Sequence, residues 1–81
     1  MKTLALQNKL SWLEVSENNI RHNVNEIRRV ISDDVLLAPC VKANAYGHGL
    51  IQMAKLLTKC GVDWLCVNSL DEAILIRDSG I

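Results

Sequence analysis

Two mostly apolar runs constrain the fold of this chain more than any other feature of its sequence. The run VLLAPCV at residues 35–41 shows no alternation of apolar and polar residues, which is typical of a strand buried on both faces in a parallel sheet covered by helices. The run VDWLCVN at residues 62–68 is similar, and SWLEV at residues 11–15 alternates enough to predict a third, short strand. Within the first run, Pro39 has no N–H to donate to a sheet, so we expect a local distortion there.

A helix is predicted over residues 17–31, between the first two strands. Ser16 has the side chain of an N-cap, and Glu17 suits the positive end of the helix dipole. Apolar residues recur at steps of four, three and four, which predicts one buried stripe along the helix. The stripe consists of Ile20, Val24, Ile27 and Ile31.

Two further helices are predicted, one after each of the later strands. The second helix follows the sequence VKANAYGHG and should stop near Cys60, because Gly61 can take the left-handed conformation of a helix C-cap. Ser69 and Glu72 fit a capping box that opens the third helix, and Gly80 ends it as Gly61 ends the second. The expected apolar positions are Leu50, Ile51, Ala54, Leu56 and Leu57 in the second helix, and Leu70, Ala73 and Ile74 in the third.

The predicted elements follow one another as strand, helix, strand, helix, strand, helix. Strands separated by helices of this length need right-handed crossovers and form a parallel sheet, so the sequence predicts the α/β class. The chain has 81 residues, 49% hydrophobic and 22% charged, which is ordinary for at most one small folded domain. Because so few parallel strands leave the sheet edges open, we expect the chain to be the front piece of a larger protein, or else to need a partner chain.

Charge and cysteine content exclude several classes of protein. Nine basic and nine acidic side chains balance, which gives no reason to expect nucleic acid or an anionic membrane as a partner. The number of cysteines is odd, and no two of them have C-x-x-C spacing, so we expect neither a disulfide framework nor a metal site. The three cysteines are Cys40, Cys60 and Cys66. Each has apolar neighbours, which favours small buried side chains in a reducing compartment.

The amino-terminal sequence MKTLALQNKLSW contains only a short apolar patch. Gln7, Asn8 and Lys9 interrupt this patch well before it reaches the length of a signal peptide. No run elsewhere approaches the length of a membrane span. The expected location is therefore the cytoplasm.

The motif VKANAYGHG at residues 41–49 carries the candidate chemistry. An isolated lysine at a strand end is usually a solvated charge. Lys42, however, lies where a predicted buried strand meets a loop that opens a helix, and in helix-covered parallel barrels the carboxyl ends of the strands carry the chemistry. An amine in such a place can attack a carbonyl group and form a Schiff base, or it can take a proton.

The residues after the lysine suit a ligand that bears a phosphate. Tyr46 offers a hydroxyl donor, and Gly47 and Gly49 permit unusual backbone angles at a helix start, where N–H groups are unpaired. Each of these residues also has a purely structural interpretation. Tyr46 is then a half-buried packing residue, and His48 and Asn44 are ordinary turn residues without a ligand. The side chains that stay small beside the lysine are Ala43, Asn44 and Ala45.

VKANAYGHG resembles the pyridoxal-phosphate attachment motif of bacterial alanine racemases. The resemblance continues in WLEVSENNIRHNVNEIRR at residues 12–29, which is similar to the opening segment of that family. It extends through DWLCVNSLDEAILIRDSGI at residues 63–81, which is similar to the next strand and helix. The lysine motif is highly specific and the flanking patterns are moderately so. Pro39 and Cys40 depart from the family, which usually has small aliphatic residues before the lysine.

The resemblance implies a fold much larger than this chain. The family fold is a parallel (β/α)8 barrel of the TIM type, followed by a β-rich carboxyl-terminal domain, and the family works as a homodimer. Residues 1–81 would then form the N-terminal part of the barrel domain that binds pyridoxal phosphate. The rest of the barrel and the carboxyl-terminal domain would be absent from this chain.

The resemblance also implies a function and roles for two residues. Lys42 would hold pyridoxal 5'-phosphate as the Schiff-base lysine and act as one of two acid–base groups in the racemisation of L-alanine to D-alanine, which supplies cell-wall peptidoglycan. Tyr46 would hydrogen-bond near the cofactor phosphate. The second acid–base group of the family is a tyrosine of the other subunit, and Tyr46 is the only tyrosine here, so we expect this chain alone to be inactive. The alternatives are a racemase for another amino acid, such as serine, and a non-catalytic barrel protein that binds pyridoxal phosphate.

Overall fold

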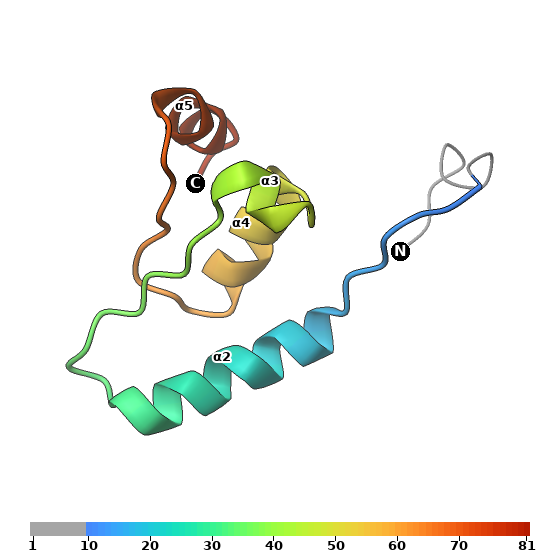
Figure 1. Cartoon of the computed structure of the whole chain (residues 1–81). Coiled ribbons are helices and arrows are strands. Elements are labelled where there is room, and N and C mark those ends of the chain that lie inside the picture. The colour runs from blue at the N-terminus through green and yellow to red at the C-terminus, as the bar shows by residue number, and fades with distance from the viewer. Residues whose placement is uncertain (1–9) are drawn as a thin grey trace.

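The computed structural model describes residues 10–81, whose helices gather around one central helix, α4 (Figure 1). Helix α4 contacts α2, α3 and α5, and residues 10–15 extend away from this group. The chain therefore has its core around α4. The helical elements of the described residues are α2 (Glu17–Ile31), α3 (Lys42–Tyr46), α4 (Leu50–Lys59) and α5 (Leu70–Asp78).

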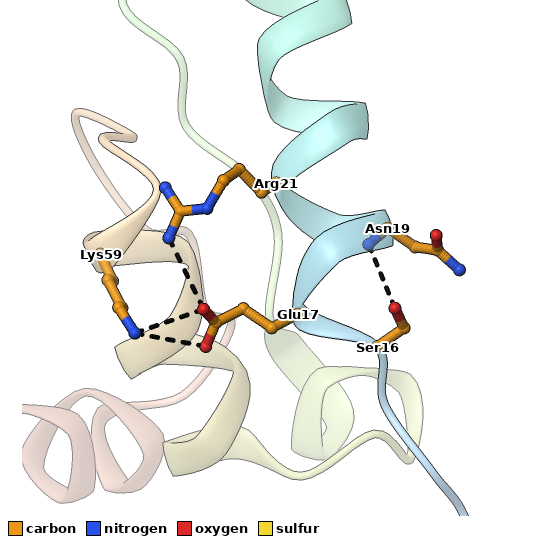
Figure 2. Close-up of polar contacts among 5 residues, drawn as sticks. All are labelled: Ser16, Glu17, Asn19, Arg21 and Lys59. Atoms are coloured by element: carbon orange, nitrogen blue, oxygen red, sulfur yellow. Dashed lines mark hydrogen bonds and ion pairs between the residues drawn. The ribbon is translucent and has the colours of Figure 1, made fainter.

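Helices α2, α4 and α5 confirm the three predicted helices, because local capping fixes their ends. The Ser16 hydroxyl accepts a hydrogen bond from the N–H of Asn19 at 3.2 Å (Figure 2). The Ser69 hydroxyl accepts from the N–H of Glu72, also at 3.2 Å. Such caps each contribute about 1 kcal/mol to helix stability. Gly61 and Gly80 take positive φ angles of 91° and 96° just past the ends of α4 and α5, as predicted.

A charged cluster joins the start of α2 to the end of α4. Both carboxylate oxygens of Glu17 accept from the Lys59 amine at 3.3 Å, and Arg21 lies 3.8 Å from the same carboxylate (Figure 2). The acid lies in the first turn of one helix and the lysine in the last turn of the other, so each charge also suits its own helix dipole. Because the side chains are exposed, each pair contributes at most about 1 kcal/mol.

The core contains more of α4 and less of the other helices than the sequence indicated. Among the predicted stripe positions of α2, Ile27 is 48% exposed, and on α5 Leu70 is 75% exposed. The sequence prediction was wrong for α5 because apolar residues surround this helix, so their spacing does not select one face. Ile76 is the buried position of α5, and Met53 of α4 was also missed. The buried residues of the core are Val24, Val41, Ala45, Leu50, Met53, Ala54, Leu57 and Ile76.

The three predicted strands require correction, because residues 10–81 contain no regular strand. Residues 11–15 are irregular. Residues 35–41 and 62–68 are extended segments that run parallel and lead into α3 and α5, but only one parallel bridge, between Cys40 and Cys66, joins them (Figure 1). The barrel predicted from the family resemblance thus remains a prediction, and the described residues supply two of its expected neighbouring segments.

Pro39 explains why the two segments do not form a regular ladder. The N–H of Trp64 donates to the Leu37 carbonyl at 3.2 Å, and the N–H of Cys66 donates to the Pro39 carbonyl at 2.9 Å. In a parallel ladder, the bond between these two would run from the N–H of residue 39 to the carbonyl of residue 64. Proline has no N–H, so this bond is missing, which is the distortion that the sequence predicted.

Arg28 fixes the end of α2 to both extended segments. Its guanidinium donates to the Val35 carbonyl at 2.9 Å, to the Gly61 carbonyl at 3.3 Å and to the Asp63 carboxylate at 2.8 Å. The same oxygen of Asp63 accepts from the N–H of Leu37 at 2.8 Å. One ion pair therefore sets the position of each segment against the other and against α2.

The cysteines only partly follow the prediction of burial. All three thiols are free, and Cys60 is half-buried against the core. Cys40 and Cys66 are exposed, so the prediction was wrong for them. Both lie at the bridge on the face of the extended segments that α4 does not cover, whereas Val41 faces the core.

No helix within residues 10–81 combines the length and the apolar character that crossing a membrane requires. The prediction about the amino-terminal apolar patch concerns residues 1–9, which lie outside the described residues.

The Pro39→Ala variant should acquire the missing ladder bond. The new N–H faces the Trp64 carbonyl, so in the intact protein the amide of residue 39 should exchange with deuterium slowly. Stability should change by less than about 1 kcal/mol, because the added bond is offset by a more flexible unfolded chain. The amide of Cys66, which is already bonded to residue 39, serves as the reference. Unprotected exchange at residue 39 would contradict this explanation.

The Asp63→Asn variant should lose stability in a pH-dependent manner. The Leu37 N–H, followed by the Arg28 guanidinium, holds the pKa of Asp63 below its ordinary value. A carboxylate with a pKa lowered by folding stabilises the folded state above its unfolded pKa, and this stabilisation is lost as pH falls through the folded pKa. The urea midpoint of the unsubstituted protein should exceed that of the variant from about pH 5 upward, and the difference should shrink below about pH 4. An equal difference at both ends of this range would contradict the assignment.

Candidate functional site

Lys42 lies where the first extended segment ends and α3 begins. The residue before it, Val41, is only 1% exposed, and its N–H donates to the Cys66 carbonyl at 2.8 Å. These contacts fix the backbone that leads into the lysine. Lys42 itself is half-buried, and within residues 10–81 its amine takes part in no hydrogen bond or ion pair. The structure thus presents, at a fixed backbone position, an amine that forms no hydrogen bond or ion pair with residues 10–81 and whose charge acts on the neighbouring Cys40 thiol.

The backbone after Lys42 forms a left-handed helical turn, which the sequence did not predict. Ala43, Asn44, Ala45 and Tyr46 have φ angles of 53°, 56°, 54° and 56°. For residues other than glycine, the left-handed conformation costs roughly 1–2 kcal/mol each. Such strain persists only where surrounding contacts stabilise it. The small side chains that the sequence analysis noted beside the lysine are thus the residues in this strained turn.

Contacts inside the turn supply part of this stabilisation. The N–H of Ala45 donates to the Val41 carbonyl at 2.8 Å, and the N–H of Gly47 donates to the Ala43 carbonyl at 3.2 Å. The Ala45 side chain is buried in the core. Gly47 follows with a φ of 91°, a conformation that glycine adopts without strain, and ends the turn.

Asn44 connects the turn to two other helices. Its side-chain oxygen accepts from the N–H of Leu50, the first residue of α4, at 2.8 Å. Its own N–H donates to a carboxylate oxygen of Glu72, in the first turn of α5, at 3.1 Å. Asn44 is therefore more than the ordinary turn residue that the sequence allowed. Glu72 was predicted only as a capping residue, and no local sequence signal indicates its contact with residue 44.

Tyr46 turns back toward the end of the extended segment. Its hydroxyl lies close enough to the Cys40 thiol for each group to shift the pKa of the other, and the backbone N–H of Lys42 acts on the same thiol. The Lys42 N–H, followed by the Tyr46 hydroxyl, lowers the pKa of the Cys40 thiol, and the same contact with Cys40 raises the pKa of Tyr46. The phenol of Tyr46, which is a 61% exposed residue, and the thiol of Cys40 therefore lie together beside Lys42.

His48 makes only local contacts within this part of the chain. Its ring Nδ1 lies 2.9 Å from the Ala45 carbonyl, which also accepts the backbone N–H of His48 at 3.0 Å. This arrangement is typical of a turn residue, the interpretation that the sequence favoured. The candidate site therefore consists of Lys42, Tyr46 and Cys40, with Asn44 and Glu72 beside them.

The arrangement is suited to a ligand that carries an aldehyde and an anionic group. An unpaired amine can condense with an aldehyde, and an exposed phenol beside it can donate to a phosphate oxygen. Pyridoxal phosphate has both groups, so Lys42 and Tyr46 fit this cofactor. The described residues contain no group of three or more histidine, cysteine or acidic side chains that could hold a metal ion.

Comparison with known proteins identifies the family. The family model described as "Alanine racemase, N-terminal domain" matches residues 15–81. An amino-acid racemase of Enterococcus faecalis is 45% identical over 67 residues, which are 83% of this chain and 10% of that protein. Alanine racemase 2 of Caldanaerobacter subterraneus subsp. tengcongensis is 48% identical over 69 residues, which are 85% of this chain and 18% of that protein.

A solved structure supports the same assignment. The crystal structure of alanine racemase from Oenococcus oeni superimposes with a TM-score of 0.75 and 46% sequence identity, over 84% of this chain and 19% of that chain. This chain thus spans between a tenth and a fifth of the length of the proteins it matches. The family predicted from the sequence motifs is confirmed: the chain belongs to the alanine racemase family, in the region of its N-terminal domain.

Proposed function

We propose that the protein containing this chain is a pyridoxal-phosphate-dependent alanine racemase, an isomerase that interconverts L-alanine and D-alanine. The observation that carries this proposal is the unpaired amine of Lys42, at a fixed backbone position in the motif VKANAYGHG. Membership of a family whose relatives are named racemases supports it. We further propose a cytoplasmic role in supplying D-alanine for peptidoglycan.

Lys42 and Tyr46 have distinct proposed roles. Lys42 would hold the cofactor covalently through its amine. Once the amino group of the substrate has displaced it from the cofactor, the freed amine would move a proton to and from one face of the substrate α-carbon. Tyr46 would donate a hydrogen bond near the cofactor phosphate, which its exposed position permits. When bound, the pyridoxal ring supplies an electron sink that stabilises negative charge at the α-carbon.

Racemisation also needs an acid–base group on the opposite face of the α-carbon. The family resemblance implies a tyrosine in this role, and Tyr46 is the only tyrosine of the sequence. The second group is therefore proposed to come from outside this chain. We propose a tyrosine from the other subunit of a homodimer, bound against a complete (β/α)8 barrel. The 81-residue chain alone should accordingly be inactive.

A racemase with a different substrate is the second candidate. The relative from Enterococcus faecalis is named an amino-acid racemase, without a specified amino acid. The described residues around Lys42 include no side chain that distinguishes alanine from serine. The two candidates are separated by incubating the intact protein with L-alanine and with L-serine and following the optical rotation of each solution. If the protein binds the cofactor but changes the optical rotation of no amino acid, a non-catalytic binding protein is favoured.

Lys42 should be the residue that binds the cofactor covalently. Borohydride reduction of the intact protein loaded with pyridoxal phosphate should fix the cofactor mass to the peptide that contains Lys42. The Lys42→Ala variant should lose this label and lose at least about 100-fold in racemisation rate. Lys55→Ala, a change at an exposed lysine of α4, serves as the matched control and should retain both. A covalent label that persists in Lys42→Ala would contradict the proposed role.

The cofactor should protect Cys40 from alkylation. Because the pKa of Cys40 is lowered, its thiolate should react with iodoacetamide at lower pH than an ordinary thiol, whose pKa is about 8.5. Pyridoxal phosphate bound at Lys42 and Tyr46 should cover the sulfur and slow the reaction severalfold, as measured by mass spectrometry of the Cys40 peptide. The half-buried Cys60 provides the internal control. Equal rates at Cys40 with and without cofactor would count against this placement of the site.

A further inference from the structure

We propose that Glu72 of α5 is a positioning residue for the site, because it holds the left-handed turn that separates Lys42 from Tyr46. This inference rests on the proposed function, in which Lys42 and Tyr46 bind the same cofactor. The role differs from that of a catalytic residue. Glu72 acts through the backbone of Asn44, whose N–H donates to its carboxylate at 3.1 Å.

The contact with Glu72 satisfies a backbone group that the turn leaves open. The first N–H groups of any helical turn lack a partner inside the turn. Within α3, the N–H of Ala45 finds the Val41 carbonyl, whereas the N–H of Asn44 points to the Glu72 carboxylate, 28 residues later in the chain. Because Ala43, Asn44, Ala45 and Tyr46 all have left-handed backbone angles, the turn depends on contacts of this kind.

Glu72 is itself held in place from its own helix. Its N–H donates to the Ser69 hydroxyl at 3.2 Å, and its second carboxylate oxygen lies 3.5 Å from the same hydroxyl. The Glu72 side chain is half-buried, so its direction is restricted by packing as well. One carboxylate oxygen therefore faces the cap of α5, and the other faces the turn after Lys42.

The electrostatic field of Glu72 also reaches the site. Its charge opposes the lowering of the Cys40 pKa that Lys42 and Tyr46 cause. This effect is smaller than the hydrogen bonds to Cys40, but it places the carboxylate near the same cluster independently of the contact with Asn44. Loss of the carboxylate should thus let the turn relax and move Lys42 relative to Tyr46.

The test compares three substitutions in the intact protein. Glu72→Ala removes the acceptor for the Asn44 N–H. Glu72→Gln retains a carbonyl oxygen at the same reach and so should rescue the contact. Ser16→Ala is the matched control, because it removes the serine cap of another helix, α2, and leaves Glu72 and its contact with Asn44 in place.

The dissociation constant for pyridoxal phosphate, followed by absorbance, is the first measurement. Glu72→Ala should weaken cofactor binding roughly threefold to tenfold, the effect expected when an exposed backbone donor loses one hydrogen bond. Glu72→Gln should stay within about twofold of the unsubstituted protein, since a neutral acceptor remains. Ser16→Ala should lower the melting temperature and leave the dissociation constant unchanged. Wild-type affinity in Glu72→Ala, or equal weakening in Ser16→Ala, would overturn the proposal.

Deuterium exchange at the Asn44 amide is the second measurement, and it does not depend on cofactor. Exchange should accelerate in Glu72→Ala and remain slow in Glu72→Gln and Ser16→Ala. If Glu72→Ala does not fold, Glu72→Asp replaces it, because its shorter side chain keeps the charge but does not reach residue 44. If the unsubstituted protein binds no cofactor, the proposed function fails. The exchange pattern then still decides the role of Glu72, and equal exchange in all variants overturns it.

Discussion

The left-handed turn between Lys42 and Tyr46 is the constraint on which the rest of the site depends. Four consecutive residues other than glycine adopt a conformation that each of them disfavours, so the turn exists only because its surroundings stabilise it. Val41 is buried in the core before the turn, and within the turn the Asn44 side chain accepts from the N–H of Leu50, the first residue of α4. This geometry returns Tyr46 to the Cys40 sulfur, at the end of the segment that carries Lys42.

Contacts outside the turn fix the extended segments that lead into it. The Arg28 guanidinium donates to both segments, and the Asp63 carboxylate that it contacts also accepts from the N–H of Leu37. Pro39 interrupts the ladder between the segments, yet the bridge at Cys40 restores the pairing directly before the lysine. The distortion at Pro39 thus lies before the proposed cofactor lysine. Directly before Lys42, the N–H of Val41 donates to the Cys66 carbonyl, and the Val41 side chain is buried in the core.

Local signals in the sequence predicted the helices well, because capping serines and terminal glycines act through neighbouring residues. Ser16 and Ser69 cap the helices that they were expected to cap.

The strands were less predictable. An apolar run such as residues 35–41 indicates burial, and within it only Pro39 indicates that a hydrogen bond of the ladder would be missing. The left-handed turn was missed because, among residues 43–46, only Asn44 is of a type that often adopts positive φ. The contact between Glu72 and Asn44 joins distant parts of the chain, so no local pattern reveals it. The family and its lysine were recognisable because VKANAYGHG is a specific motif.

A crystal structure of the intact protein grown with pyridoxal phosphate tests the central claim most directly. We expect electron density that is continuous from the Lys42 side chain to the cofactor, with residues 43–46 in the left-handed turn and the Tyr46 hydroxyl near the phosphate. A Lys42 amine that points into bulk solvent, with the cofactor absent or bound elsewhere, would contradict the account.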